Sequence, residues 1–237
     1  MKTIQAELGV QGEQAFCSEH DGFLAFGRPV VPTSNNRILL RAPELCFNFG
    51  TDAMVGMLEW TSREISKHYP SPEFSGVKLI LGDISAPRGG PLFGLTGRRR
   101  HLSHASGQDV DIGFLSVQKG KDSPVQFSRQ FETVSNWWLI QSIFKNPFAC
   151  VKVLFLDRHH IRTLNKFAKK DKNWASLKRF VRHMPGHKNH MHVRIGKGPG
   201  GPGCYPGARP ELELEADDEH IEKEEETQEP GTGGASL

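Results

Sequence analysis

The spacing of hydrophobic residues predicts a series of helices after a loop-rich beginning. Residues 10–50 show no clear period and several turn signals, a pattern typical of loops with short strands. Over residues 52–67, apolar side chains fall on one broad helical face, and Thr51 stands before them as the predicted N-cap. Further helices are predicted over residues 129–145, 158–170 and 173–182.

Short apolar or alternating runs predict four strands. They cover residues 77–81, 109–112, 151–156 and 190–195. In the second strand, alternation puts Asp109 and Asp111 on one face. In the fourth, His190 and His192 share a face, while the apolar residues that alternate with them point into a core.

Length and composition indicate one globular domain, which we place at residues 1–200 with an irregular beginning. A chain of 237 residues with 37% hydrophobic residues can bury a substantial core. A mean hydropathy of −0.46, without an apolar run near about 18 residues, argues against a membrane span. The first residues contain one lysine and no apolar stretch, so they are not a secretory signal peptide as they stand.

The formal net charge of +3 conceals two oppositely charged parts. Residues 211–229 contain eleven Asp or Glu side chains and a single lysine, Lys223, a formal charge of −10. Residues 1–210 therefore carry about +13. The tail, residues 201–237, is Gly/Pro-rich and then acidic, and we expect it to be disordered. Two roles for the acidic run stay open: masking the basic surface or adding solubility.

The four cysteines are far apart and form no CxxC pair, so they signal neither a zinc ribbon nor a thioredoxin-type site. They are Cys17, Cys46, Cys150 and Cys204. Two disulfides, in any of three pairings, and four reduced thiols both fit this spacing. Cys204 favours disulfides slightly, because a thiol in a Gly/Pro loop is more useful as a tether than as part of a core.

Six of the eleven histidines fall in two short segments, and this clustering indicates a metal site. They are His101, His104, His183, His187, His190 and His192. Zinc in a hydrolytic site takes three nitrogen or oxygen ligands from the protein and leaves one position open. Gly107 supplies a turn between the first segment and Asp111 on the strand that follows. The chain has no HExxH motif, so a thermolysin-like helical site is excluded.

The two histidine segments resemble those of a known family. HASGQDVD at residues 104–111, followed far downstream by HKNHMHVR at residues 187–194, resembles the penicillin-insensitive murein endopeptidases of the MepA type. These enzymes belong to the LAS group of zinc metallopeptidases, which includes the D-Ala-D-Ala metallopeptidases. LGDI at residues 81–84 and DKNW at residues 171–174 extend the resemblance.

The resemblance implies an α+β fold in which a small antiparallel β-sheet, flanked by helices, carries one zinc ion. It implies His104, Asp111 and His192 as the metal ligands. It also implies His190 as the catalytic base, with His187 as an accessory catalytic histidine.

Three further residues are candidates for supporting the ligands or lining the substrate pocket. His101 matches a histidine that precedes the first ligand in the family. Asp109 shares a face with Asp111, so it either orients a ligand or is an ordinary polar residue at a sheet edge. Asp83, at a strand end, either positions a histidine or the substrate, or caps a turn.

The implied reaction is hydrolysis of D-Ala–diaminopimelate amide cross-links in peptidoglycan by a metal-activated water. The expected partners are peptidoglycan stem peptides, with no nucleic acid, and the expected location is periplasmic or extracellular. A D,D-carboxypeptidase or dipeptidase of the same group is an alternative. A non-catalytic murein-binding module is another, disfavoured because every proposed ligand and the base are present.

A metal-dependent nuclease is the alternative from a different class, since a basic body also suits nucleic acid. Asp157, His159 and His160, with Asn173 and His183, loosely resemble a ββα-metal nuclease motif. Asp157 is instead expected to cap a helix, and the motif leaves the second histidine segment unexplained.

Overall fold

The computed structural model describes residues 14–16, 22–93, 101 and 103–196. The expected domain end near residue 200 and the acidic tail lie outside these residues. Among the described residues, none of the helices has the length and apolar character needed to cross a membrane.

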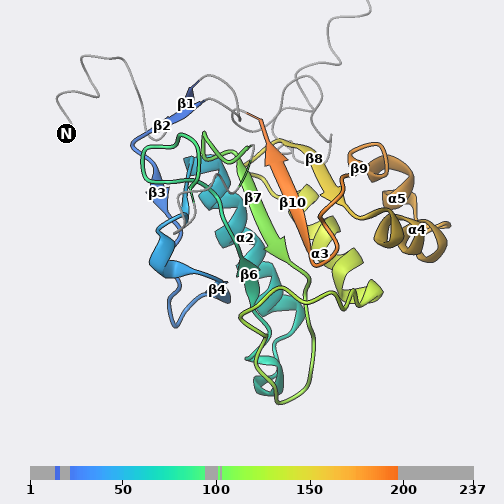
Figure 1. Cartoon of the computed structure of the whole chain (residues 1–237). Helices are drawn as coiled ribbons and strands as arrows, with labels where there is room; N and C mark the ends of the chain where they lie inside the picture. Colours follow the sequence, from blue (N-terminus) through green and yellow to red (C-terminus); the bar gives the residue numbers. More distant parts are fainter. Residues whose placement is uncertain (1–13, 17–21, 94–100, 102, 197–237) are drawn as a thin grey trace, which may run out of the picture.

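A six-stranded mixed sheet forms the centre of the molecule (Figure 1). In spatial order its strands are β4 (Ile38–Leu40), β6 (Leu79–Leu81), β7 (Asp109–Gly113), β10 (His190–Ile195), β8 (Val151–Leu156) and β9 (Val181–His183). The four strands predicted from the sequence are confirmed as β6, β7, β8 and β10. The α+β class is confirmed as well.

The expectation of a small, antiparallel sheet is only partly correct. The central strands β6, β7, β10 and β8 pair antiparallel, whereas β4 with β6 and β8 with β9 are parallel pairs. Parallel neighbours need a crossover connection, which is usually helical. Here α2 (Asp52–His68) lies between β4 and β6, and α4 (Arg158–Phe167) with α5 (Lys172–Leu177) lies between β8 and β9. The sequence predicts these helices, but it does not predict the edge strands β4 and β9 that they connect to β6 and β8.

Two helices cover one face of the sheet. In α2, the Thr51 hydroxyl accepts a hydrogen bond from the Met54 backbone N–H at 3.2 Å, which confirms the predicted N-cap. Figure 1 shows α2 and α3 (Thr133–Lys145) together behind the sheet. Val110 of β7 and Val193 of β10 are fully buried in the same core as these helices. The residues that alternate with them therefore point to the opposite face.

The chain after β8 departs from the prediction at one place. Asp157 caps α4 as expected, since its carboxylate accepts the His159 backbone N–H at 2.9 Å. The helix expected over residues 173–182 ends as α5 at Leu177, and β9 follows it. β9 has three residues, and two of them are exposed at the edge of the sheet. Such a strand has too few buried residues to produce a recognisable pattern.

The loop-rich beginning is confirmed, with short strands in two-stranded pairs. They are β1 (Gln14–Phe16), β2 (Phe23–Ala25), β3 (Arg28–Pro29) and β5 (Phe49–Gly50), and the 3-10 turns are η1 (Pro43–Leu45) and η2 (Pro72–Phe74). Cys150 is disulfide-bonded, while Cys46 is free and exposed. The chain therefore forms at most one internal disulfide. Cys17 and Cys204 lie outside the described residues.

Candidate metal centre

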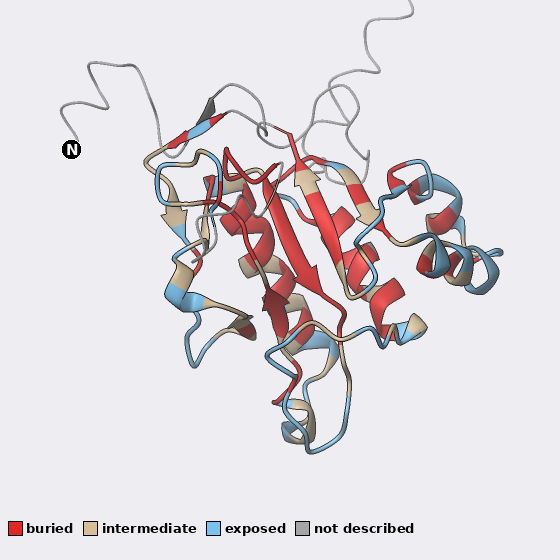
Figure 2. Cartoon of the chain, viewed as in Figure 1, coloured by how far each residue is buried: buried red, intermediate tan, exposed pale blue. Residues whose placement is uncertain are grey.

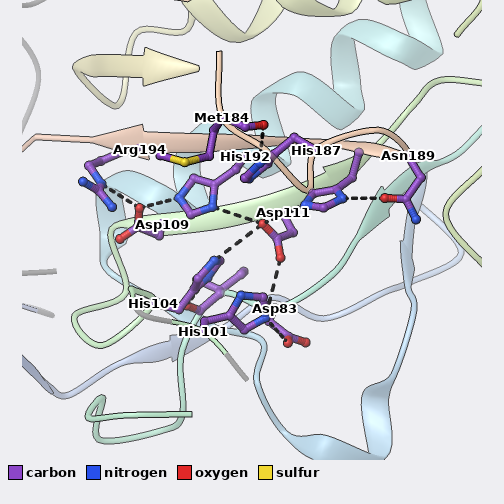
Figure 3. A network of polar contacts seen from close by, with 12 residues as sticks. Asp83, His101, His104, Asp109, Asp111, Met184, His187, Asn189, His192 and Arg194 are labelled. Atoms are coloured by element: carbon purple, nitrogen blue, oxygen red, sulfur yellow. Dashed lines mark hydrogen bonds and ion pairs between the residues drawn. The ribbon is translucent and has the colours of Figure 1, made fainter. Parts of the chain in front are cut away.

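The pairing of β7 with β10 brings the two histidine segments together. His192 lies directly opposite Asp111, and His190 lies opposite Gly113. Because directly opposed residues share a face, Asp111, His190 and His192 project together from the face opposite the helices. Figure 3 shows the side chains of Asp111 and His192 pointing toward each other, as their contact of 3.2 Å requires. The shared face of His190 and His192 predicted from their spacing is confirmed.

His104 reaches the same point from a tight loop. Its backbone has a φ of +69°, which is uncommon for a residue with a side chain. Gly107 also has a φ of +69°, and its carbonyl accepts the Thr51 backbone N–H at 3.2 Å. This turn sends the chain back into β7, as the sequence predicted. His104 is completely buried as a result.

One oxygen of Asp111 is the centre of the cluster. Its Oδ1 lies 3.2 Å from His192 Nδ1, 3.5 Å from His104 Nε2 and 3.6 Å from His190 Nε2. Nevertheless, Asp111 Oδ1 and His104 Nε2 are both buried and have no hydrogen-bond partner. Ligands at about 2.0–2.1 Å from a tetrahedral zinc are separated by about 3.3–3.4 Å. The observed spacing therefore suits ligands around a metal better than hydrogen-bonded partners.

Hydrogen bonds fix which ring nitrogens carry protons. His104 Nδ1 lies 3.1 Å from the Ile84 carbonyl oxygen, which can only accept, so Nδ1 is the donor and Nε2 is the ring nitrogen that faces Asp111. His190 Nδ1 bonds to Asn189 Oδ1 at 2.9 Å, which leaves its Nε2 facing Asp111. Ligating histidines typically donate the second ring nitrogen to such an acceptor.

The residues around Asp111 form two overlapping groups that could hold a metal ion. One comprises His101, His104 and Asp111, and the other Asp111, His187 and His190, each with ligand atoms within 4.8 Å of one another. His192, which the resemblance implies as a ligand, belongs to neither group. Of the three histidines around Asp111 Oδ1, however, His192 makes the shortest contact.

Asp109 lies behind His192, away from Asp111. His192 Nε2 donates to Asp109 Oδ1 at 2.6 Å, and Arg194 Nε donates to the same oxygen at 2.8 Å. Burial acts to lower the pKa of His192, but its hydrogen bond to Asp109 and the negative charges of Asp109 and Asp111 outweigh burial and raise that pKa to about 9. Asp109 is therefore placed to orient His192. It is not at a sheet edge, because β7 is an interior strand.

Both aspartates are held in the ionised form. Burial would raise the pKa of Asp109, but the hydrogen bond and charge of His192 lower it to about 2. Burial would likewise raise the pKa of Asp111, and the charges of His104 and His192 hold it well below its usual range. Asp111 can therefore bind a cation without first losing a proton.

His101 and Asp83 form a pair beside the cluster. His101 Nε2 lies 2.9 Å from Asp83 Oδ2 and 3.8 Å from Asp111 Oδ2. Asp83 therefore positions a histidine, one of the two roles left open by the sequence. His101 is more exposed than His104, so it lies toward the outside of the site.

His190 and His187 lie on the outer side of the cluster. Burial lowers the pKa of His190 to about 4, despite the opposing effect of Asp111, and burial also lowers the pKa of His187. His187 Nδ1 bonds to the Met184 and Pro185 carbonyl oxygens, both at 3.2 Å. Both histidines are therefore neutral at pH 7. Each uses Nδ1 for a hydrogen bond to a backbone or side-chain oxygen, so Nε2 is the ring nitrogen left for other contacts.

Phe127 and Arg41 join the site although the sequence does not predict them. The ring of Phe127 stacks on His190, with centroids 5.1 Å apart and an interplanar angle of 20°. The Arg41 guanidinium carbon lies 4.7 Å from the same Phe127 centroid. A Cβ atom at Gly113 would lie 2.9 Å from Phe127, so the missing side chain leaves room for this ring. Neither residue has a sequence signal, because each joins the site through a long-range contact.

The residues of the nuclease alternative have other roles. Asp157 caps α4. His160 is buried, stacks on Phe131, and bonds through Nε2 to the Lys188 carbonyl oxygen at 3.0 Å. Within the described ranges, neither group capable of holding a metal includes His159, His160 or His183.

A scan of the chain against protein-family models gives no match, and a search of curated proteins gives none either. What the site itself shows is a partly buried set of histidine and aspartate side chains that could hold a metal ion.

Proposed function

We propose that this protein is a zinc-dependent peptidase of the LAS group that hydrolyses peptide amides of peptidoglycan. One observation carries the proposal: three histidine ring nitrogens lie 3.2–3.6 Å from the buried Oδ1 of Asp111. A buried carboxylate oxygen surrounded by nitrogens at this spacing suits a small divalent cation with nitrogen and oxygen ligands. The resemblance of the two histidine segments supports the same assignment.

His104, Asp111 and His192 would hold the zinc. His104 and His192 are the more deeply buried histidines of the cluster, and the second nitrogen of each is bonded to a fixed acceptor. When bound, zinc supplies Lewis acidity and lowers the pKa of water to about 7. Three protein ligands leave a fourth position open for chemistry.

His190 is the proposed general base. Its low pKa keeps the ring neutral at pH 7, and its bond to Asn189 directs the Nε2 lone pair toward the cluster. Nε2 accepts a proton from the attacking water and then delivers it to the leaving amine. His187, whose ring centroid lies 4.8 Å from that of His190, is the proposed accessory residue.

Arg41 is the proposed contact for a substrate carboxylate. Its Nε is buried and has no hydrogen-bond partner, and its guanidinium lies over Phe127 beside His190. Peptidoglycan stem peptides carry free carboxylates, which a guanidinium recognises through charge-assisted hydrogen bonds. The D-Ala–diaminopimelate cross-link is the proposed substrate. Because peptidoglycan lies outside the cytoplasmic membrane, the proposed location of the enzyme is the periplasm or the outside of the cell.

Digestion of purified cross-linked muropeptides, with the products identified by mass spectrometry, tests the proposal. We expect cleavage of dimeric muropeptides into monomers, whereas release of terminal D-Ala alone would indicate a carboxypeptidase. His190→Ala is expected to retain one zinc per chain and lose most of the hydrolysis. His159→Ala, which changes an exposed histidine on α4, is the matched control. No cleavage by the zinc-loaded wild-type protein would contradict the proposed function.

A further inference from the structure

The positive charge of the protein is concentrated on one side of the fold. Residues 158–188, which form α4, α5, β9 and the loop before β10, contain ten Lys or Arg side chains and a single acid, Asp171. All ten are exposed, and together we name them the basic lobe. They are Arg158, Arg162, Lys166, Lys169, Lys170, Lys172, Lys178, Arg179, Arg182 and Lys188. Figure 2 shows this side of the molecule largely exposed.

Acidic side chains do not balance this charge locally. Asp171 is used as the N-cap of α5, where it accepts the Asn173 backbone N–H at 2.8 Å. Among the described residues, none of the ten cations forms an ion pair with an acid. Cations elsewhere do have such partners, as Lys67 does with Glu64 and Lys119 with Glu73.

The cations on α4 form an ordered row. Arg158, Arg162 and Lys166 recur every four residues, so they share one face of that helix. Like charges at this spacing repel one another and destabilise a helix slightly. A row of unpaired like charges on one helix therefore favours a polyanionic partner.

We propose that the acidic segment, residues 211–229, binds the basic lobe of the same chain. The formal charge of this segment is −10, and that of residues 158–188 is +9. The two nearly cancel, and this accounts for the small total charge of the protein.

The connection between the two regions is long enough for this contact. Fourteen residues separate Gly196, the last described residue, from Glu211, and fourteen residues can span up to about 46–50 Å. β10 is separated from β9, the strand of the basic lobe, only by β8, two strand spacings or about 10 Å. A tether of this kind gives an effective concentration in the millimolar range. That concentration favours the chain's own acidic segment over an external polyanion.

The basic lobe adjoins the metal centre in the loop between β9 and β10. Lys188 belongs to the basic lobe, and the adjacent His187 lies in the metal cluster. Bound to the lobe, the acidic segment would compete with anionic molecules for it. This inference does not depend on the proposed reaction.

Zero-length carbodiimide cross-linking of the intact chain tests the contact, because it joins only carboxylates and lysines that touch. In the monomeric fraction at 20 mM salt, we expect the acidic segment to be joined to Lys166, Lys169, Lys170, Lys172 and Lys178. We expect at least tenfold fewer links to the exposed control lysines Lys119, Lys121 and Lys145. At 500 mM salt the difference should disappear, since surface charges are then screened over about 4 Å. An even distribution of links at low salt would overturn the proposal.

Binding to a single-stranded oligonucleotide, used as an external polyanion, gives a second readout. A full-length variant with the eleven acids of residues 211–229 changed to Gln or Asn is compared with the wild type by fluorescence anisotropy. We expect at least tenfold tighter binding by the variant at low salt, because the basic lobe is then uncovered. A further change of Lys166, Lys169 and Lys170 to Gln should reverse this gain, whereas changing Lys119, Lys121 and Lys145 should not. Equal affinities of the wild type and the acid-neutralised variant would overturn the proposal.

Discussion

Each histidine around Asp111 has one ring nitrogen committed to a neighbouring acceptor. His104 uses the Ile84 carbonyl oxygen, His192 uses Asp109, and His190 uses Asn189. The other nitrogen of each ring faces the aspartate oxygen. The orientations of the rings are thereby set before any ligand binds, so metal binding needs little movement of these side chains.

The charge of His192 predicts a pH-dependent metal affinity. Its pKa of about 9 in the metal-free protein means that the ring is protonated at pH 7, and a metal ligand must give up that proton. Affinity for zinc should therefore rise about tenfold per pH unit between pH 7 and 8.5 and level off above pH 9. Competition with a chromogenic chelator across this range measures the slope.

Asp109→Asn is the matched variant for this measurement. The amide oxygen can still accept the His192 Nε2–H, but the carboxylate charge that raises the pKa is lost. We expect the slope above pH 7 to flatten and zinc affinity at pH 8.5 to fall about 10- to 100-fold. A slope unchanged from the wild type would show that the proton displaced by zinc does not come from His192.

Replacing Arg41 is expected to weaken substrate binding without loss of the metal. Replacing it with Gln removes the charge from the guanidinium beside His190. We expect KM for carboxylate-bearing muropeptides to rise about 10- to 100-fold, since hydrogen bonds to charged groups contribute about 1.5–3 kcal/mol. Zinc content should not change. An equal rise for a substrate whose carboxylate is amidated would assign Arg41 a general structural role instead.

At the scale of elements, the sequence predicts those that are long or regularly patterned. The helix over residues 52–67 and the strands around Asp111 and His192 have clear periods, and they occur as predicted. These strands also carry two of the three proposed ligands. β4 and β9 have three residues each, and their pairing depends on contacts that no local pattern records. Phe127 enters the site for a similar reason, from a loop far from His190 in the sequence.

The N-cap of α2 gives a prediction at this scale. Thr51→Ala removes the hydroxyl that accepts the Met54 backbone N–H, so it should lower the free energy of unfolding by about 1 kcal/mol. Thr51→Ser should restore most of this loss. The backbone bond from Thr51 to Gly107 is present in both variants, so zinc affinity should not change. Urea denaturation and chelator competition measure the two quantities, and equal stability of the Ala variant and wild type would contradict the cap's contribution.

At the scale of the whole molecule, the metal centre joins segments that are distant in the sequence. His104 comes from a loop, Asp111 from β7, and His190 and His192 from β10. The sheet supplies the alignment, because the register of β7 with β10 places Asp111 opposite His192. A ligand that binds this arrangement cannot bind the unfolded chain equally well. Metal binding should therefore stabilise the entire fold.

Thermal unfolding with and without zinc tests this coupling. Free zinc at about 1,000 times its dissociation constant adds about 4 kcal/mol to the free energy of unfolding, which for a domain of this size raises Tm by about 8–16 °C. Removal of zinc with a chelator should reverse the increase. His104→Ala should abolish it, because this change removes the completely buried histidine of the proposed ligand set, whereas His159→Ala should retain it. If His104→Ala kept the full increase while His190→Ala lost it, the ligand would be His190, and the roles proposed for the two histidines would have to be exchanged.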